Sequence, residues 1–199
     1  MTAGLIICGA LAREVRDLVQ KNNWGAELIG VPAVDHMFPE RIAPHVKERI
    51  QQHKDRYQRL IVVYGDCGTK GALDEMLREY PEVEQLTGPH CYEFYGGEKF
   101  QEWMEEEPGS YFLTDFMVRT FEGLIKKSMG LDRFPDLKKD YFRNYRRVVF
   151  LTQTNKTEYR QRAEEIAEYL GLPLTVKPTG YGKLETRLRK LLNDDVQEG

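Results

Sequence analysis

The stretch LIVVYGDCGTKG, residues 60–71, joins an apolar run to a glycine-rich turn, and a helical pattern follows it. The run 60–64 is rich in β-branched residues, which favours a buried β-strand. Residues 70–80 place apolar side chains on one face of a helix, namely Leu73, Met76, Leu77 and Tyr80. A strand that passes through a short turn into an amphipathic helix is the building unit of α/β proteins. The stretch therefore predicts an α/β fold.

The same alternation of strand and helix patterns extends over almost the whole chain. We expect further strands at residues 5–8, 27–31, 83–87, 111–114, 147–151 and 174–177, and further helices at 12–21, 39–53, 97–107, 117–129, 157–170 and 182–192. This order predicts a mainly parallel sheet with helices on both faces. We expect residues 1–130 to form a larger α/β portion that carries the functional site. Residues 147–199 then form a β-α-β-α portion packed into the same domain, with 131–146 as the link.

The composition narrows the class of protein. At 199 residues, with 41% hydrophobic and 31% charged residues, the chain suits one sizeable globular domain. The net charge of -3 gives no electrostatic reason to expect nucleic acid as a partner. No apolar run approaches the ~20 residues of a membrane span, and residues 1–4 lack the features of a signal peptide. We therefore expect a cytoplasmic protein without a membrane partner, in a reducing compartment that disfavours disulfides.

Each of the three cysteines comes after an apolar run. Cys8 and Cys67 follow predicted strands, and Cys91 follows a third run. The carboxyl ends of neighbouring parallel strands meet at one edge of a sheet, where open α/β sheets bind ligands. Thiolates gathered there predict a metal site formed by Cys8, Cys67 and Cys91, with zinc or an iron–sulfur cluster bound and one coordination position open. The alternative is that Cys8 and Cys67 are small buried hydrophobic residues.

Three further polar residues are candidate catalytic groups. His36 follows the second strand and would reach the same edge as a ligand or a general base, unless it is an exposed loop histidine. Asp66 would either support a metal ligand or cation from outside the coordination sphere or cap the following helix. Because successive side chains of an extended chain point apart, we favour Cys91 as the ligand and His90 as a group outside the coordination sphere or facing the substrate.

Two glycine-rich turns are candidate cofactor-binding loops. Gly65 and Gly68 lie on either side of Cys67, and Gly180 and Gly182 precede the last helix. Glycines let the backbone approach a ligand closely, and a helix N-terminus favours an anion. The first turn does not match the GxxxxGK[ST] pattern of NTPases. Both segments can equally be ordinary strand-to-helix turns.

Short motifs spread over residues 5–192 occur in a characteristic order: Cys8-Gly9, His36, Pro39-Glu40, Tyr64-Gly65, Cys67-Gly68, His90-Cys91, Pro108-Gly109 and Tyr111 to Thr114. This order resembles an uncharacterised family of small cytoplasmic proteins that are commonly called domain-of-unknown-function proteins. Such proteins are frequently encoded beside corrinoid-dependent methyltransferases of one-carbon metabolism. The chain departs from the family pattern at His90-Cys91-Tyr92, where the family has His-Asp-Cys-Ile. It departs again at residues 114–117, where the family has Thr-Pro-Gly-Trp.

The resemblance implies a metal-binding pocket and a link to methyl transfer, because alkylation of a zinc-bound thiolate is a methyl-transfer step. We therefore expect a metal-dependent transferase, or a component of one, with zinc or an iron–sulfur cluster bound and a corrinoid as a further candidate cofactor. The expected partner is a small-molecule ligand or a methyltransferase or corrinoid protein. The alternatives are a non-catalytic corrinoid- or metal-binding accessory module and a structural subunit with buried thiols. The sequence leaves the metal, the substrate and the oligomeric state open.

Overall fold

The computed structural model describes residues 2–193, which form two compact units. Unit 1 contains residues 2–94 and 183–193, and unit 2 contains residues 95–182. The segment 131–146, in which the sequence suggested a link between two portions, lies inside unit 2.

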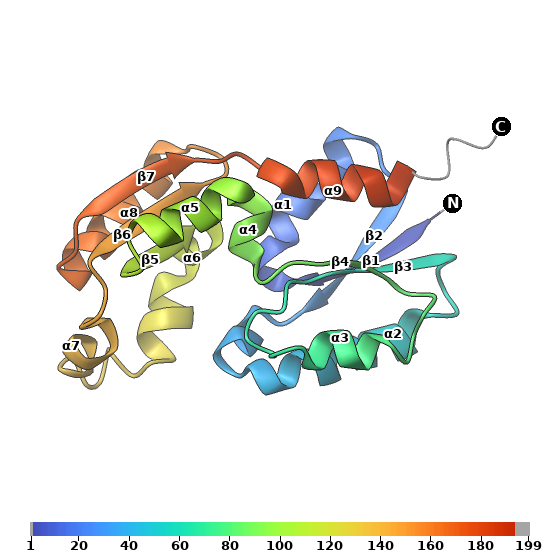
Figure 1. Ribbon diagram of the computed structural model, residues 1–199, viewed down its shortest axis with the longest axis horizontal. Helices are drawn as coiled ribbons and strands as arrows, with labels where there is room; N and C mark the ends of the chain where they lie inside the picture. Colours follow the sequence, from blue (N-terminus) through green and yellow to red (C-terminus); the bar gives the residue numbers. More distant parts are fainter. Residues whose placement is uncertain (1, 194–199) are drawn as a thin grey trace. The chain divides into compact units, whose positions relative to one another are not determined.

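Unit 1 is built on a parallel sheet with the strand order β2-β1-β3-β4 (Figure 1). The strands are β1 (Ala3–Cys8), β2 (Ala26–Val31), β3 (Arg59–Val63) and β4 (Glu84–Leu86). All neighbouring strands are parallel, so their carboxyl ends lie at the same edge. The central strands β1 and β3 are apolar runs buried on both faces, as in other covered parallel sheets; Leu5 and Ile61 are both fully buried.

Helices cover both faces of this sheet, with α2 and α3 on one face and α1 and α9 on the other (Figure 1). The helical segments are η1 (Gly9–Leu11), α1 (Ala12–Lys21), η2 (Ala33–Met37), η3 (Pro39–Arg41), α2 (Ile42–His53), α3 (Ala72–Leu77), α4 (Cys91–Gly96) and α9 (Gly182–Asn193). The long helices turn apolar residues spaced three or four apart towards the sheet. These fully buried residues include Val15 and Leu18 of α1, Val46 and Ile50 of α2, and Leu184 and Leu188 of α9.

Unit 2 has its own parallel sheet, with the strand order β5-β6-β7. Its elements are α5 (Glu98–Glu106), β5 (Ser110–Thr114), α6 (Asp115–Thr120), the π-helical segment η4 (Phe121–Lys127), α7 (Leu137–Phe142), β6 (Arg147–Thr152), α8 (Thr157–Leu170) and β7 (Leu174–Pro178). Leu113, Phe150 and Ile166 lie in the core of this unit. None of the helices in the described part of the chain is long and apolar enough to span a membrane.

The α/β fold class predicted from the sequence is confirmed, and all strand pairs in the described residues are parallel. The strands are divided between two sheets, however. The segment expected to be a link contains helix α7. Phe142 of this helix is buried in the core of unit 2, so the segment is packed into that unit. Cys91 does not end a strand but is the first residue of α4.

Candidate metal centre

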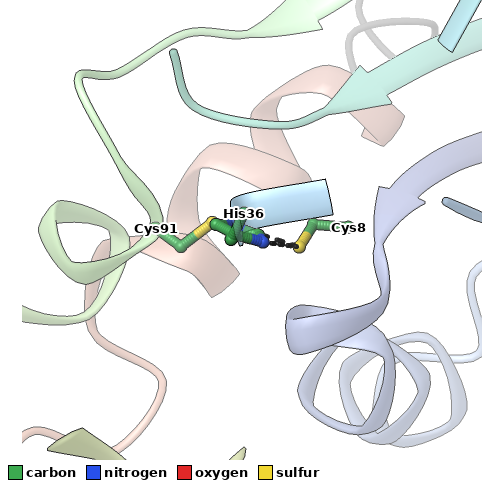
Figure 2. Close-up of side chains that lie close together, drawn as sticks. All are labelled: Cys8, His36 and Cys91. Atoms are coloured by element: carbon green, nitrogen blue, oxygen red, sulfur yellow. Dashed lines mark hydrogen bonds between the residues drawn. The ribbon is translucent and has the colours of Figure 1, made fainter. Parts of the chain in front are cut away.

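Four side chains with metal-binding atoms come together in unit 1; we call them the thiol–imidazole cluster, formed by Cys8, His36, Cys67 and Cys91. The ligand atoms of Cys8, His36 and Cys91 all lie within 4.8 Å of one another. Figure 2 shows the His36 ring between the thiols of Cys8 and Cys91. The fourth member joins this group through Cys91, because the Sγ atoms of Cys67 and Cys91 are 3.7 Å apart. The cluster therefore combines residues that are distant in the sequence.

Cys8 is positioned by the end of the central strand β1. It is the last residue of that strand and is fully buried. The chain then turns immediately into η1, and the Ala10 N–H donates a hydrogen bond to the Cys8 sulfur over 3.3 Å. The strand end and this hydrogen bond fix the thiol at the carboxyl edge of the sheet.

His36 is positioned by the short 3₁₀ helix η2, which follows β2. Its ring nitrogens Nδ1 and Nε2 lie 3.9 and 3.8 Å from the Cys8 Sγ atom. Nδ1 also lies 3.0 Å from the carbonyl oxygen of Ala33. Because a carbonyl oxygen only accepts, this bond keeps a proton on Nδ1 and makes Nε2 the nitrogen that would bind a metal ion after losing its own proton. A backbone carbonyl that fixes the tautomer is a common support for a metal-binding histidine.

The helix η2 is itself held by a buried acid that the sequence analysis did not identify. Asp35 is 1% exposed, and its carboxylate lies 2.7 Å from the His45 Nδ1 atom. This contact ties η2 to α2. The signal in the sequence was only that Asp35 is adjacent to His36, which does not predict the partner ten residues away.

Cys67 and Cys91 are brought together by two loops that bond to each other through the backbone. The Asp66 N–H donates to the carbonyl oxygen of Gly88 over 2.8 Å, and the Cys67 N–H donates to that of Pro89 over 3.0 Å. Cys67 has a positive φ of 48°, in the left-handed region. The loop after β3 therefore runs against the loop before α4, and the two sulfurs meet.

Gly65 permits this close approach. A Cβ atom at Gly65 would lie 2.8 Å from the Cα atom of His90, so a larger residue would push the two loops apart. Gly68, with φ +90°, turns the chain directly after Cys67. Both glycines therefore have a backbone role in holding the cluster, which is the turn interpretation that the sequence left open.

The other predicted site residues lie outside the cluster. The Asp66 carboxylate accepts hydrogen bonds from the Gly71 N–H (2.8 Å), the Lys70 N–H (3.2 Å) and the Thr69 hydroxyl. Burial acts to raise the pKa of Asp66, but these hydrogen bonds outweigh it and lower the pKa. Asp66 thus caps its own turn. The His90 ring packs against Tyr92 at 5.5 Å and is not part of the three-ligand group.

Gly180 and Gly182 belong to unit 2 rather than to the unit that carries the cluster. Both have positive φ angles, of 56° and 52°. A Cβ atom at Gly182 would lie 2.0 Å from the carbonyl oxygen of Tyr95. In the structure these glycines serve a tight turn and a close backbone contact.

The three thiols of the cluster differ in the direction in which their pKa values are shifted. Burial raises the pKa of Cys8, but hydrogen bonds with Cys91 and His36 outweigh it and hold that pKa well below its usual value. Hydrogen bonding to Cys91 lowers the pKa of Cys67 to about 5 against the opposing effect of burial, and His36 contributes. The same bonds to Cys67 and Cys8, together with burial, raise the pKa of Cys91 well above its usual value. These shifts favour the thiolate forms of Cys8 and Cys67 even without a metal, and a thiolate is the form that binds one.

The imidazole carries the balancing positive charge. Burial acts to lower the pKa of His36, but hydrogen bonds and charge attraction with Cys67 and Cys8 outweigh it and raise the pKa to about 11. A metal cation at this position would replace the proton of His36 as the partner of the thiolates.

Tyr64, which follows β3, lies beside the thiol–imidazole cluster. From the sequence it was expected only to end a strand. Its side chain is fully buried, and its ring stacks on the His36 ring at 5.8 Å with an angle of 18°. Burial and the negative charges of Cys8 and Cys67 hold the pKa of Tyr64 far above its usual value. The hydroxyl therefore remains protonated beside the thiolates.

The distances within the cluster are compatible with one metal ion. Zinc–sulfur bonds of ~2.3 Å place two sulfur ligands roughly 3.8 Å apart. The Cys67–Cys91 distance of 3.7 Å matches this spacing, and the three-ligand group within 4.8 Å needs only a small contraction. Mixed thiolate and imidazole ligands are those of zinc sites.

A family model described as "Protein of unknown function (DUF1638)" matches residues 31–188. The match includes His36, Cys67 and Cys91, whereas Cys8 lies before it. No curated protein and no solved structure matches the chain significantly.

Proposed function

The chain belongs to this family of proteins of unknown function, and we propose from the cluster itself that it binds a metal ion through Cys8, His36 and Cys91, with Cys67 as the fourth donor. The observation that carries the proposal is the approach of three ligand atoms within 4.8 Å in the buried end of the sheet. Packing alone does not explain why an imidazole converges with two thiols, since a buried imidazole needs a polar or charged partner.

We propose zinc as the metal. A nitrogen ligand beside thiolates is typical of zinc, whereas most iron–sulfur clusters are held by thiolates alone. A zinc ion at this site would supply Lewis acidity at any coordination position open to a ligand. The chain's own groups then orient the site: the Ala33 carbonyl holds the His36 ring, and the Ala10 N–H holds the Cys8 sulfur.

Cys67 is the donor that we expect to exchange. It is partly exposed, whereas Cys8 and Cys91 are buried, and it lies outside the group of three. A ligand that enters from solvent would therefore displace Cys67 before the other donors. We propose that the site works in this open form as a metal-dependent transferase or a component of one. Its place in methyl transfer or corrinoid metabolism rests on the resemblance of the motifs alone.

Metal content of protein purified anaerobically tests the proposal. We expect about one zinc per chain and no visible absorption. Cys8→Ser, His36→Ala and Cys91→Ser should each remove most of the metal, and Cys67→Ser should weaken binding less. His90→Ala is the matched control for His36→Ala, because His90 adjoins the site without belonging to the three-ligand group, and it should retain the metal.

Four results would change the conclusion. If the purified protein is coloured and contains iron and sulfide, the bound group is an iron–sulfur cluster and not zinc. Equal metal content in His36→Ala and His90→Ala, or no metal in the wild type, would refute the proposed site. A metal that responds to no added ligand would support the accessory or structural alternative instead of a transferase.

A further inference from the structure

We infer that the Tyr64 hydroxyl donates a hydrogen bond to an exogenous ligand at the fourth position of the proposed metal, and that the site therefore selects small anions that carry a hydrogen-bond acceptor, such as a carboxylate. This inference rests on the proposed function and specifies the ligand class of the same site.

The first observation is an unsatisfied polar atom. The Tyr64 side chain is 0% exposed, and its buried hydroxyl makes no hydrogen bond of good geometry in the part of the chain that the structure describes, although the Cys8 thiol is close enough to interact with it. Buried hydroxyl groups are nearly always paired, because an unpaired one loses its bonds to water without replacement. Phenylalanine would fill the same space without this penalty. The hydroxyl therefore lacks a well-formed partner, and a ligand bound beside Cys8 would supply one.

The second observation is the place of this hydroxyl. Tyr64 directly follows the central strand β3, at the edge where Cys8 ends β1. Its ring stacks on the His36 ring, which belongs to the three-ligand group. The tyrosine is thus a wall of the cluster rather than part of the distant apolar core. Because the Tyr64 hydroxyl interacts with the Cys8 thiol, a ligand atom on a metal bound by Cys8 would be close to it.

The third observation concerns charge. If Cys67 were displaced from a bound metal, the ion would lose an anionic donor, and a second anion would restore the charge around the cation. An O–H group donates a stronger hydrogen bond to an anion than to a neutral acceptor. A neutral ligand without a free acceptor, such as imidazole, gains nothing from the hydroxyl.

The test compares two probes on cobalt(II)-loaded protein, whose visible spectrum reports ligand binding. Acetate is the anionic acceptor, and imidazole is the matched ligand without a free acceptor. In Tyr64→Phe we expect the cobalt stoichiometry of the wild type, a dissociation constant for acetate raised about tenfold or more, and a constant for imidazole changed less than about twofold. Thermal stability should be equal or higher, because the unpaired hydroxyl is gone.

Tyr57→Phe is the control variant. The Tyr57 hydroxyl already donates a hydrogen bond to Glu27 over 2.7 Å. Its removal should therefore change the stability of the protein but not the dissociation constant of acetate or imidazole. Equal changes for acetate and imidazole in Tyr64→Phe, or no change for either, would overturn the inference while leaving the metal site intact. Loss of cobalt from Tyr64→Phe would also overturn it, because the tyrosine would then support the donors instead of the ligand. Failure of the wild type to bind cobalt or zinc would refute the proposed function itself.

Discussion

Gly65→Ala is expected to separate the two loops that hold Cys67 and Cys91. The added Cβ would lie 2.8 Å from the His90 Cα atom, whereas ordinary contacts begin at 3.4 Å. The loops must therefore move apart by about 0.6 Å, because the obstacle is backbone and cannot rotate away. The Cys67 N–H bond to the Pro89 carbonyl, now 3.0 Å, would lengthen beyond ordinary hydrogen-bond range.

The energetic effect follows from these two losses. Overpacking at a rigid contact costs about 1–3 kcal/mol, and each weakened backbone hydrogen bond costs about 0.5–1.5 kcal/mol. We expect a total destabilisation of about 1.5–4.5 kcal/mol. The Cys67–Cys91 sulfur distance of 3.7 Å should grow with the loop separation, so the fourth donor should bind the metal less well.

Chemical unfolding of the metal-free protein measures the first effect, and competition for zinc with a coloured chelator measures the second. Gly30→Ala is the matched control, because a Cβ at Gly30 meets nothing within 4 Å. Its free energy of unfolding should change by less than about 1 kcal/mol. Gly65→Ala protein with wild-type stability and wild-type zinc affinity would refute the argument that this contact sets the position of the cluster.

Three further outcomes are expected. Oxidation of metal-free protein by hydrogen peroxide should form a Cys67–Cys91 disulfide, because these sulfurs are 3.7 Å apart. Mass spectrometry should show that the peptides carrying Cys67 and Cys91 are linked and have lost two hydrogen atoms, while Cys8 stays a free thiol. Bound zinc should protect all three thiols from oxidation. The stability of metal-free protein should rise with pH between about 5 and 6.5, because the folded pKa of Cys67 lies below that of a free thiol. Above pH 6.5 the raised pKa of His36 opposes this rise, because the folded protein keeps a proton that the unfolded chain loses. A Cys67→Ser variant with the same slope between about pH 5 and 6.5 would contradict this. His45→Ala removes the partner of buried Asp35 and should destabilise the protein by about 1–3 kcal/mol and weaken zinc binding; urea unfolding and zinc competition measure these effects, and unchanged zinc affinity would separate the contact from the site.

The sequence by itself determined the local elements and their order. Helix α8 spans Thr157–Leu170 as predicted, and Gly171 ends it in the left-handed conformation, with φ 73°. Strands β1 and β3 also lie where their apolar runs predicted them. Hydrophobic periodicity and capping residues act over a few neighbouring positions, so they can be recognised in the sequence without the tertiary structure. Because alternating strands and helices favour parallel pairing, the sequence also indicated that Cys8 and Cys67 would approach one sheet edge.

Only the tertiary structure decided which ligands meet. His36 lies 28 residues from Cys8 and reaches it because η2 turns its ring inwards and Asp35 holds that helix. Cys67 meets Cys91 through a left-handed residue and a close loop contact at Gly65. The Tyr64 hydroxyl shows its lack of a partner only when the surrounding side chains are in place. Loop conformations and contacts between distant segments depend on the packing of the whole unit, which no local pattern in the chain encodes.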